Sequence, residues 1–168
     1  FNRFRDIWWF YYALSWEDIL LRKPSLKLSF SDMVGDFPYH TAIYTNTADI
    51  FELEHLLQAL PDVAFHVLAH SHFGFNLVKL EQYPNLILYP SFDPLTSRKV
   101  LEKIDFYLDI NPFDEVDHIT ETIHQLGLPI FSFEGTNHDQ TGKNQVFKND
   151  QVDQMVEAVR DYIDTIER

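Results

Sequence analysis

The chain has 168 residues, a length typical of one compact domain. Its 26 acidic and 13 basic residues give a net charge of −13, which argues against nucleic acid and anionic membrane surfaces as partners because both would be repelled. The sequence contains no Cys, so disulfides, thiolate catalysis and Cys-based zinc sites are excluded. It shows neither an apolar run of about 18 residues nor a basic-then-apolar leader, so we expect no membrane span and a cytoplasmic location.

Residues 1–36 differ from the rest of the chain. Residues 7–14 read IWWFYYAL and are apolar on every side, whether they form a helix or a strand. Such a segment must be buried on more than one face or must meet another domain or chain. We therefore expect residues 1–14 to contact a partner subunit or a second copy of the chain, with ordinary core packing as the alternative. A linker near residues 35–40 would separate this part from a domain over residues 37–168.

Five short, apolar, β-rich runs follow, and their starts are 22, 22, 21 and 22 residues apart: 41–45, 63–69, 85–90, 106–110 and 128–134. Strands that are apolar throughout, rather than alternating, are typical of parallel sheets covered on both faces. The spacing leaves room for one helix and two short loops between strands, as in right-handed βαβ units. The pattern predicts an α/β fold, a Rossmann-like parallel sheet of about five to six strands with helices on both faces.

The intervening segments carry their own helical signals. Apolar residues at helical spacing predict helices over 50–60, 116–126 and 152–166. Asp93 followed by Pro94 predicts a further helix start, because proline's missing N–H costs nothing in the first turn. Gly127 is expected to end the second helix in a C′ position, and Asn149 or Asp150 to cap the third.

Polar residues follow the expected strands at their carboxyl ends, where an open parallel sheet binds its ligands. Hydroxyl, amide and imidazole groups of this kind bind a sugar or a diphosphate through hydrogen bonds. No glycine-rich phosphate loop follows the first strand, so binding would rely on these groups and on helix starts. The candidate ligand-binding residues are Asn46, Thr47, His70, Ser71, Asn111, Asp114, Glu115, Thr136, Asn137 and His138.

Each of these candidates has a simpler alternative interpretation. Asn46 and Thr47 could serve as caps of the helix after the first strand and bind no ligand. Asn111 or Asp114 could do the same for the helix after the fourth strand. The pair His70-x-His72 has no carboxylate ligands near it in sequence, so no metal site is predicted.

Two further features of the sequence bear on this site. His66 lies inside a strand and is interpreted as structural. Asp49, Asp114 and Glu115 lie near expected helix starts, where carboxylates would repel a diphosphate.

Residues 106–116 (FYLDINPFDEV) and 128–138 (LPIFSFEGTNH) carry a family resemblance. They resemble the C-terminal half of GT-B-fold bacterial glycosyltransferases. More narrowly, they are similar to the accessory-Sec complex that glycosylates serine-rich repeat adhesins. The likeness covers about residues 41–168.

The resemblance implies a protein of two Rossmann-like domains with a cleft between them. A UDP-sugar such as UDP-GlcNAc would be the donor substrate, with no separate cofactor or metal, and Ser/Thr hydroxyls of a protein the acceptor. Active retaining members carry two glutamates eight positions apart, whereas the eighth residue after Asp114 is Thr122 and after Glu115 is Ile123. Two hypotheses follow: a UDP-sugar-binding domain of a glycosyltransferase, or a non-catalytic subunit of the same fold that binds the acceptor adhesin and stabilises the catalytic partner. Activity stays open, and no catalytic residue is assigned.

Overall fold

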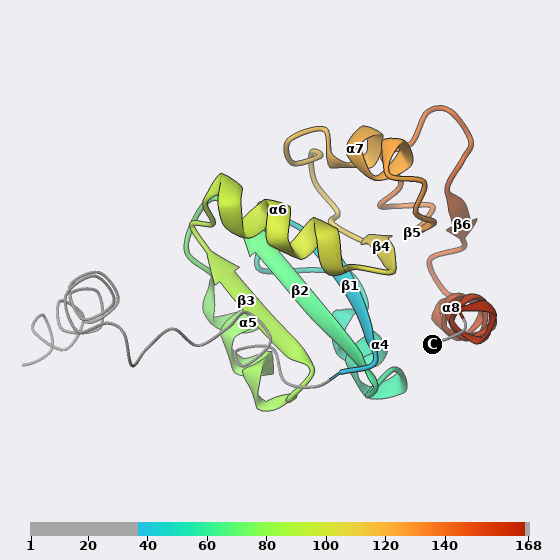
Figure 1. Ribbon diagram of the computed structural model, residues 1–168. Coiled ribbons are helices and arrows are strands. Elements are labelled where there is room, and N and C mark those ends of the chain that lie inside the picture. Colours follow the sequence, from blue (N-terminus) through green and yellow to red (C-terminus); the bar gives the residue numbers. More distant parts are fainter. Residues whose placement is uncertain (1–36, 167–168) are drawn as a thin grey trace, which may run out of the picture. The chain divides into compact units, whose positions relative to one another are not determined.

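The computed structural model describes residues 37–166, which form a six-stranded parallel sheet in the order β3-β2-β1-β4-β5-β6 (Figure 1). The strands are β1 (Tyr39–Tyr44), β2 (Val63–Ala69), β3 (Leu86–Pro90), β4 (Phe106–Asp109), β5 (Ile130–Phe133) and β6 (Gln145–Phe147). This order confirms the predicted Rossmann-like α/β fold. The apolar segment and the partner contact predicted within residues 1–36 lie outside the described residues, and the division of the chain at residue 36 stays a prediction.

Helices cover both faces of the sheet. They are α4 (Leu53–Ala59), α5 (Phe75–Val78), the 3₁₀ turn η2 (Lys79–Gln82), α6 (Pro94–Lys103), α7 (Ile119–Gln125) and α8 (Val152–Thr165). Figure 1 shows α6 crossing in front of the central strands and α4 and α5 behind them, and α8 packs against α4. Within residues 37–166, no helix is long and apolar enough to cross a membrane.

The face covered by α4 and α8 holds the main apolar core. Phe65, Phe106 and Phe131 project from neighbouring strands and are fully buried. Met155, Val159 and Ile163 of α8 and Leu53, Leu56 and Leu57 of α4 pack in the same cluster. The apolar stripe that predicted helix α8 packs it on the sheet, and the four inner strands are buried almost throughout because both of their faces are covered.

The face covered by α6 contains buried polar groups. The hydroxyl of Tyr44 on β1 bonds the Ser97 hydroxyl on α6, and burial raises the pKa of Tyr44 to about 12 although that bond opposes the shift. The N–H of Tyr44 donates to the hydroxyl oxygen of Tyr107 on β4, 3.0 Å away. These bonds tie α6 to the two strands at the centre of the sheet, where the strand order reverses.

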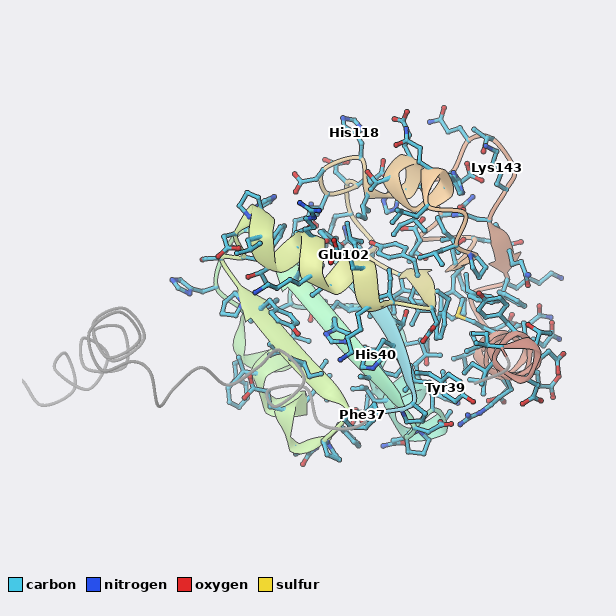
Figure 2. The ribbon with its side chains drawn as sticks, in the orientation of Figure 1. Phe37, Tyr39, His40, Glu102, His118 and Lys143 are labelled. Carbon is cyan, nitrogen blue, oxygen red and sulfur yellow. The ribbon has the colours of Figure 1, made fainter. Side chains whose placement is uncertain are left out.

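His66 belongs to a buried chain of polar groups on the same face. Its Nε2 lies 3.0 Å from Nδ1 of His40, and its Nδ1 lies 2.8 Å from the Tyr89 hydroxyl. Figure 2 places His40 on β1, between the neighbouring strand and α6. Burial lowers the pKa of His66 to about 3, so the ring is neutral and the interpretation of His66 as structural is confirmed.

Two helix ends agree with the sequence. The Asp93 carboxylate caps α6 and accepts the N–H of Thr96 at 2.6 Å. Gly127 follows α7 with φ +73°, the left-handed conformation that favours glycine. Both signals are local, and a local signal needs no tertiary contact to act.

Other predicted caps are wrong. Helix α4 begins only at Leu53 and α7 at Ile119, each after a residue with positive φ and without a side-chain cap. The residues predicted as caps therefore lie several positions before these helices and cannot cap them: Asn46 and Thr47 for α4, and Asn111 and Asp114 for α7. Gln151 precedes α8, and Asn149, predicted as a cap, instead accepts the N–H of Gly135 at 2.9 Å.

Strand β6 was not resolved as a separate element by the sequence pattern. Its three residues are exposed or half-buried, unlike the fully buried strands beside it. An edge strand of this length is stabilised by pairing with β5 rather than by apolar burial, so it leaves no run of apolar residues to detect.

Candidate functional site at the carboxyl edge of the sheet

The loop between β4 and α7 (residues 110–118, the β4–α7 loop) is the centre of the carboxyl edge. Three side chains from other strand ends bind it. The amide of Asn46, after β1, donates to the carbonyl oxygen of Asp114 at 3.1 Å. His70, after β2, lies 2.7 Å from the Asp117 carboxylate, and Nε2 of His138, after β5, lies 2.6 Å from the carbonyl oxygen of Phe113. The structure therefore brings most of the predicted residues together around one loop.

Asn111 and Thr47 shape the chain at the junction of β1 and β4. Asn111 is buried, and its amide donates to the Asp114 carbonyl oxygen at 2.9 Å while its Oδ1 accepts from the Thr45 hydroxyl at 3.3 Å. The Thr47 hydroxyl accepts the N–H of Asp49 at 3.1 Å. These groups close their own turns, as Asx and Ser/Thr turns do.

Thr136 and Asn137 hold the segment after β5. The Thr136 hydroxyl is buried and donates to the Asp109 carbonyl oxygen at 2.7 Å. The side-chain Oδ1 of Asn137 accepts from the Ser132 hydroxyl, from the N–H of Asp139 and from the side-chain amide of Asn144. Both side chains position the β5–β6 connection and leave little capacity for a ligand.

Asp109 and His138 form the most buried ion pair at this edge. Nδ1 of His138 lies 2.6 Å from Oδ1 of Asp109, and the His138 N–H donates to Oδ2 at 2.7 Å. The side chains are 3% and 18% exposed, respectively. The hydrogen bond to Asp109 raises the pKa of His138 to about 8, although partial burial opposes the shift. The His138 ring is therefore mostly protonated at neutral pH and is held in place by these hydrogen bonds.

The remaining predicted residues play smaller parts. Glu115 is half-buried and accepts the N–H of Thr120 in the first turn of α7 at 2.7 Å. The structure does not bring Ser71 to the β4–α7 loop, because Ser71 is exposed and its carbonyl oxygen accepts the N–H of Ser91. Across residues 37–166, no group of three or more His, Asp and Glu side chains could hold a metal ion.

A groove of about 550 Å³ opens at this edge between α6 and α7. The His70 ring stacks on Phe92 at its mouth, with ring centroids 4.5 Å apart and planes inclined by 26°. Its walls include Ser97, Leu101, Asp117, Thr122 and Leu126. Sequence reasoning missed Phe92 and the walls, because helix-face residues converge on a groove only once the helices are packed.

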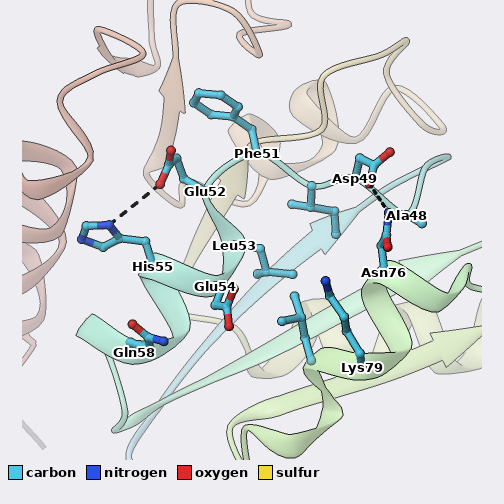
Figure 3. A pocket seen from close by; sticks show the side chains of 12 residues that line it. Ala48, Asp49, Phe51, Glu52, Leu53, Glu54, His55, Gln58, Asn76 and Lys79 are labelled. Carbon is cyan, nitrogen blue, oxygen red and sulfur yellow. Dashed lines mark hydrogen bonds and ion pairs between the residues drawn. The ribbon is translucent and has the colours of Figure 1, made fainter.

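Two other hollows border the domain. One of about 600 Å³ lies between α7 and the 138–143 segment and is lined by residues that include His118 and Lys143, both labelled in Figure 2. The other, of about 660 Å³, lies between α4 and α5 and is shown in Figure 3. There the Asn76 amide donates to Asp49 at 3.1 Å, and His55 faces Glu52 at 3.8 Å. Its acidic lining makes it unsuited to phosphate.

The comparisons with known proteins agree with this architecture. Residues 41–168 match the model of the GftB/GlyA-F C-terminal domain. The chain belongs to this family. It is 45% identical over 162 residues to the glycosyltransferase GlyB of Streptococcus pneumoniae, covering 96% of this chain and 40% of GlyB. The chain thus spans about two fifths of that relative.

Further similarities point the same way. The UDP-N-acetylglucosamine–peptide N-acetylglucosaminyltransferase stabilizing protein GtfB of Streptococcus agalactiae is 34% identical over 98 residues, covering 58% of this chain and 22% of GtfB. The crystal structure of the glycosyltransferase GlyE of Streptococcus pneumoniae superposes with a TM-score of 0.69 at 25% identity, over 95% of this chain and 41% of GlyE.

A GtfA/B complex bound to UDP and GlcNAc superposes with a TM-score of 0.67 at 23% identity, covering 89% of this chain and 36% of the matched chain, which shows the fold alone. The resemblance seen in the sequence is confirmed, and the chain is a glycosyltransferase-family domain of the GT-B C-terminal type.

Proposed function

We propose that this domain binds the UDP-sugar donor of a glycosyltransferase that modifies a Ser/Thr-rich protein. The groove between α6 and α7 carries the proposal, because it opens at the carboxyl edge beside the central strands, where open α/β sheets bind nucleotides. Its volume of about 550 Å³ lies in the range of small-molecule sites.

The groove has the chemistry for a nucleoside. A planar base gains by stacking against the His70–Phe92 pair, since offset aromatic stacking adds to area burial. The Asp117 carboxylate can accept hydrogen bonds from ribose or base donors. The sugar and diphosphate would then lie over the β4–α7 loop, near Asn46, Thr47, Asn111 and the loop after β5. Among those groups the His138 imidazolium supplies positive charge.

Filling the groove is expected to abolish donor binding. In Thr122→Trp the indole would occupy the space between α6 and α7, so the affinity for UDP and UDP-GlcNAc should fall at least about tenfold. Thr122→Val keeps the volume and should bind within about twofold of the wild-type protein. Calorimetric titration of the purified protein, with and without Mg²⁺, measures both. Equal affinities in the two variants, or no binding to folded protein at millimolar nucleotide, would contradict the proposal.

A second candidate is favoured by the same edge. Hydrogen bonds within the domain already occupy the side chains of Asn46, Asn111 and His138. The β4–α7 loop also carries Asp114 and Glu115, whose negative charges would repel a diphosphate. These observations favour a non-catalytic subunit that binds the acceptor and stabilises a glycosyltransferase partner. Under this reading the protein is not a hexosyltransferase itself, and the cytoplasm remains the predicted compartment for both readings.

The second candidate predicts a partner rather than a nucleotide. Co-expression with a catalytic glycosyltransferase of the same organism should give a stable complex with its true partner and raise the partner's melting temperature by several degrees. Deleting residues 1–14 should remove the complex if that apolar segment forms the contact. A monomeric protein that binds UDP-GlcNAc and leaves the partner's stability unchanged would decide for the first candidate.

A further inference from the structure

Both ring nitrogens of His138 face oxygen atoms at hydrogen-bonding distance. Nε2 points at the carbonyl oxygen of Phe113, which can only accept, so Nε2 must carry a proton. Nδ1 points at the Asp109 carboxylate, whose second oxygen already accepts the His138 N–H. A neutral imidazole has only one N–H and cannot donate to both. The observed geometry therefore needs the doubly protonated ring.

We propose that the Asp109–His138 pair is a proton-dependent clamp that positions the β4–α7 loop. Asp109 ends β4 and His138 follows β5, so one end of the clamp is the rigid sheet. The other end is the Phe113 carbonyl oxygen, held at 2.6 Å. Loss of one proton removes one of the two ring donors and leaves either the Phe113 carbonyl oxygen or Oδ1 of Asp109 without its ring donor.

Two of the other contacts that hold the loop are amides, which do not titrate, and the third is His70, 2.7 Å from the Asp117 carboxylate at the α7 end of the loop. Asn46 and Asn111 both donate amide N–H groups to the Asp114 carbonyl oxygen. They hold the loop at any pH, so deprotonation of His138 frees the Phe113 side of the loop first. Phe113 itself is 61% exposed, so its ring adds little packing to keep it in place.

Several charged groups surround His138 and influence this equilibrium. They come from β4, the β4–α7 loop, α7 and the segment after β5, and are Asp109, Glu115, His118, Glu121, His124, Asp139 and Lys143. The carboxylates favour the imidazolium, and Lys143 opposes it. Asp139 accepts the N–H groups of Thr141, Lys143 and Asn144, and these hydrogen bonds hold its pKa well below the usual range, so it stays ionised.

The clamp has a consequence for ligand binding that rests on the proposed function. Asp117 of the same loop forms part of the groove between α6 and α7. Release of the loop would shift this wall and weaken donor binding as the pH rises through 8. The clamp itself requires no nucleotide and can be measured without one.

NMR titration of the protein between pH 5 and 10 tests the clamp. We expect the His138 ring carbons to titrate near pH 8 and the backbone amides of residues 113–117 to shift with the same midpoint. His138→Arg, which keeps the charge and several donors, should hold the loop amides near their low-pH positions at all pH values. His138→Gln, which is neutral, should place them near their high-pH positions throughout. His118→Asn serves as the control: the His118 side chain is 92% exposed, so solvent screens it and its removal should move the midpoint far less than a change at Asp109 would.

Three results would overturn the inference. These are a His138 midpoint at or below its ordinary value of 6.5, loop amides that do not follow the ring, and a His138→Gln protein whose loop still titrates near pH 8. If the amides titrate as expected but UDP is not bound at any pH, the clamp stands and the proposed donor site fails.

Discussion

Asp109→Ala is expected to lower the free energy of unfolding by about 3–5 kcal/mol, the cost typical of breaking a buried ion pair by removing one partner. The carboxylate is 3% exposed and accepts hydrogen bonds from the His138 ring and from its N–H. Without Asp109, the imidazole loses its anion and the N–H is left unpaired near the base of the loop. Urea unfolding at pH 7 measures the difference, with the m-value checked for two-state behaviour.

A second variant and a pH profile separate the contribution of the Asp109 charge from that of its side-chain volume. Asp109→Asn keeps the volume and one acceptor, so it should cost less than Asp109→Ala. In the wild-type protein the pKa of His138 is raised, so its contribution to stability is full below pH 6.5 and is lost as the pH rises through about 8. We expect the folding equilibrium constant to fall by about tenfold across this window, because the partly exposed ring is screened by solvent. A flat stability profile from pH 6 to 9 would contradict the ion pair.

Phe131→Ala is expected to cost about 3–5 kcal/mol, the usual range for a fully buried aromatic residue in a core. Phe131 lies on β5 with its ring 5.7 Å from Phe106 and 6.3 Å from Tyr162 of α8, so its removal leaves a cavity between the sheet and that helix. Thermal unfolding followed by circular dichroism measures the loss as a lower melting temperature.

Phe113→Ala is the matched control for this substitution. The same side chain is removed, but Phe113 is 61% exposed, so the cost should stay within about 0.5 kcal/mol. Phe131→Leu, which keeps most of the volume, should cost less than about 1.5 kcal/mol. If Phe131→Ala and Phe113→Ala had equal effects, α8 would not be packed on the sheet as described.

Parallel strands leave a strong trace in a sequence because they are buried on both faces. The runs at 63–69 and 106–110 each match a strand of the sheet, and their common spacing predicts helical crossovers. The sequence predicted helix α8 equally clearly, since one face of this helix covers the core and is therefore apolar. The sequence pattern did not predict the edge strand β6, because this strand pairs on one side only and most of its surface lies outside the core.

The sequence predicted which polar residues share one edge of the sheet, but not what they contact there, and their binding of a ligand stays a prediction. The rule that parallel strands present their carboxyl ends to ligands brought Asn46, His70 and His138 to one edge. It could not show that each of them binds the β4–α7 loop. Such a partner lies 25 to 68 residues away in sequence, and its backbone conformation is decided by packing. The caps expected for α4 and α7 failed because packing starts these helices several residues after the polar positions, at Leu53 and Ile119.

By itself, the sequence determined the fold class, the alternation of five of the strands with helices, the edge of the sheet that carries polar groups and the family resemblance. Each of these depends on local periodicity or on short motifs, which act along the chain. Only the tertiary structure decided that Asp109 and His138 form a pair, that His70 stacks on Phe92, and that α6 and α7 enclose a groove. These features depend on distances between distant segments, which exist only once the apolar faces of the helices have packed on the sheet.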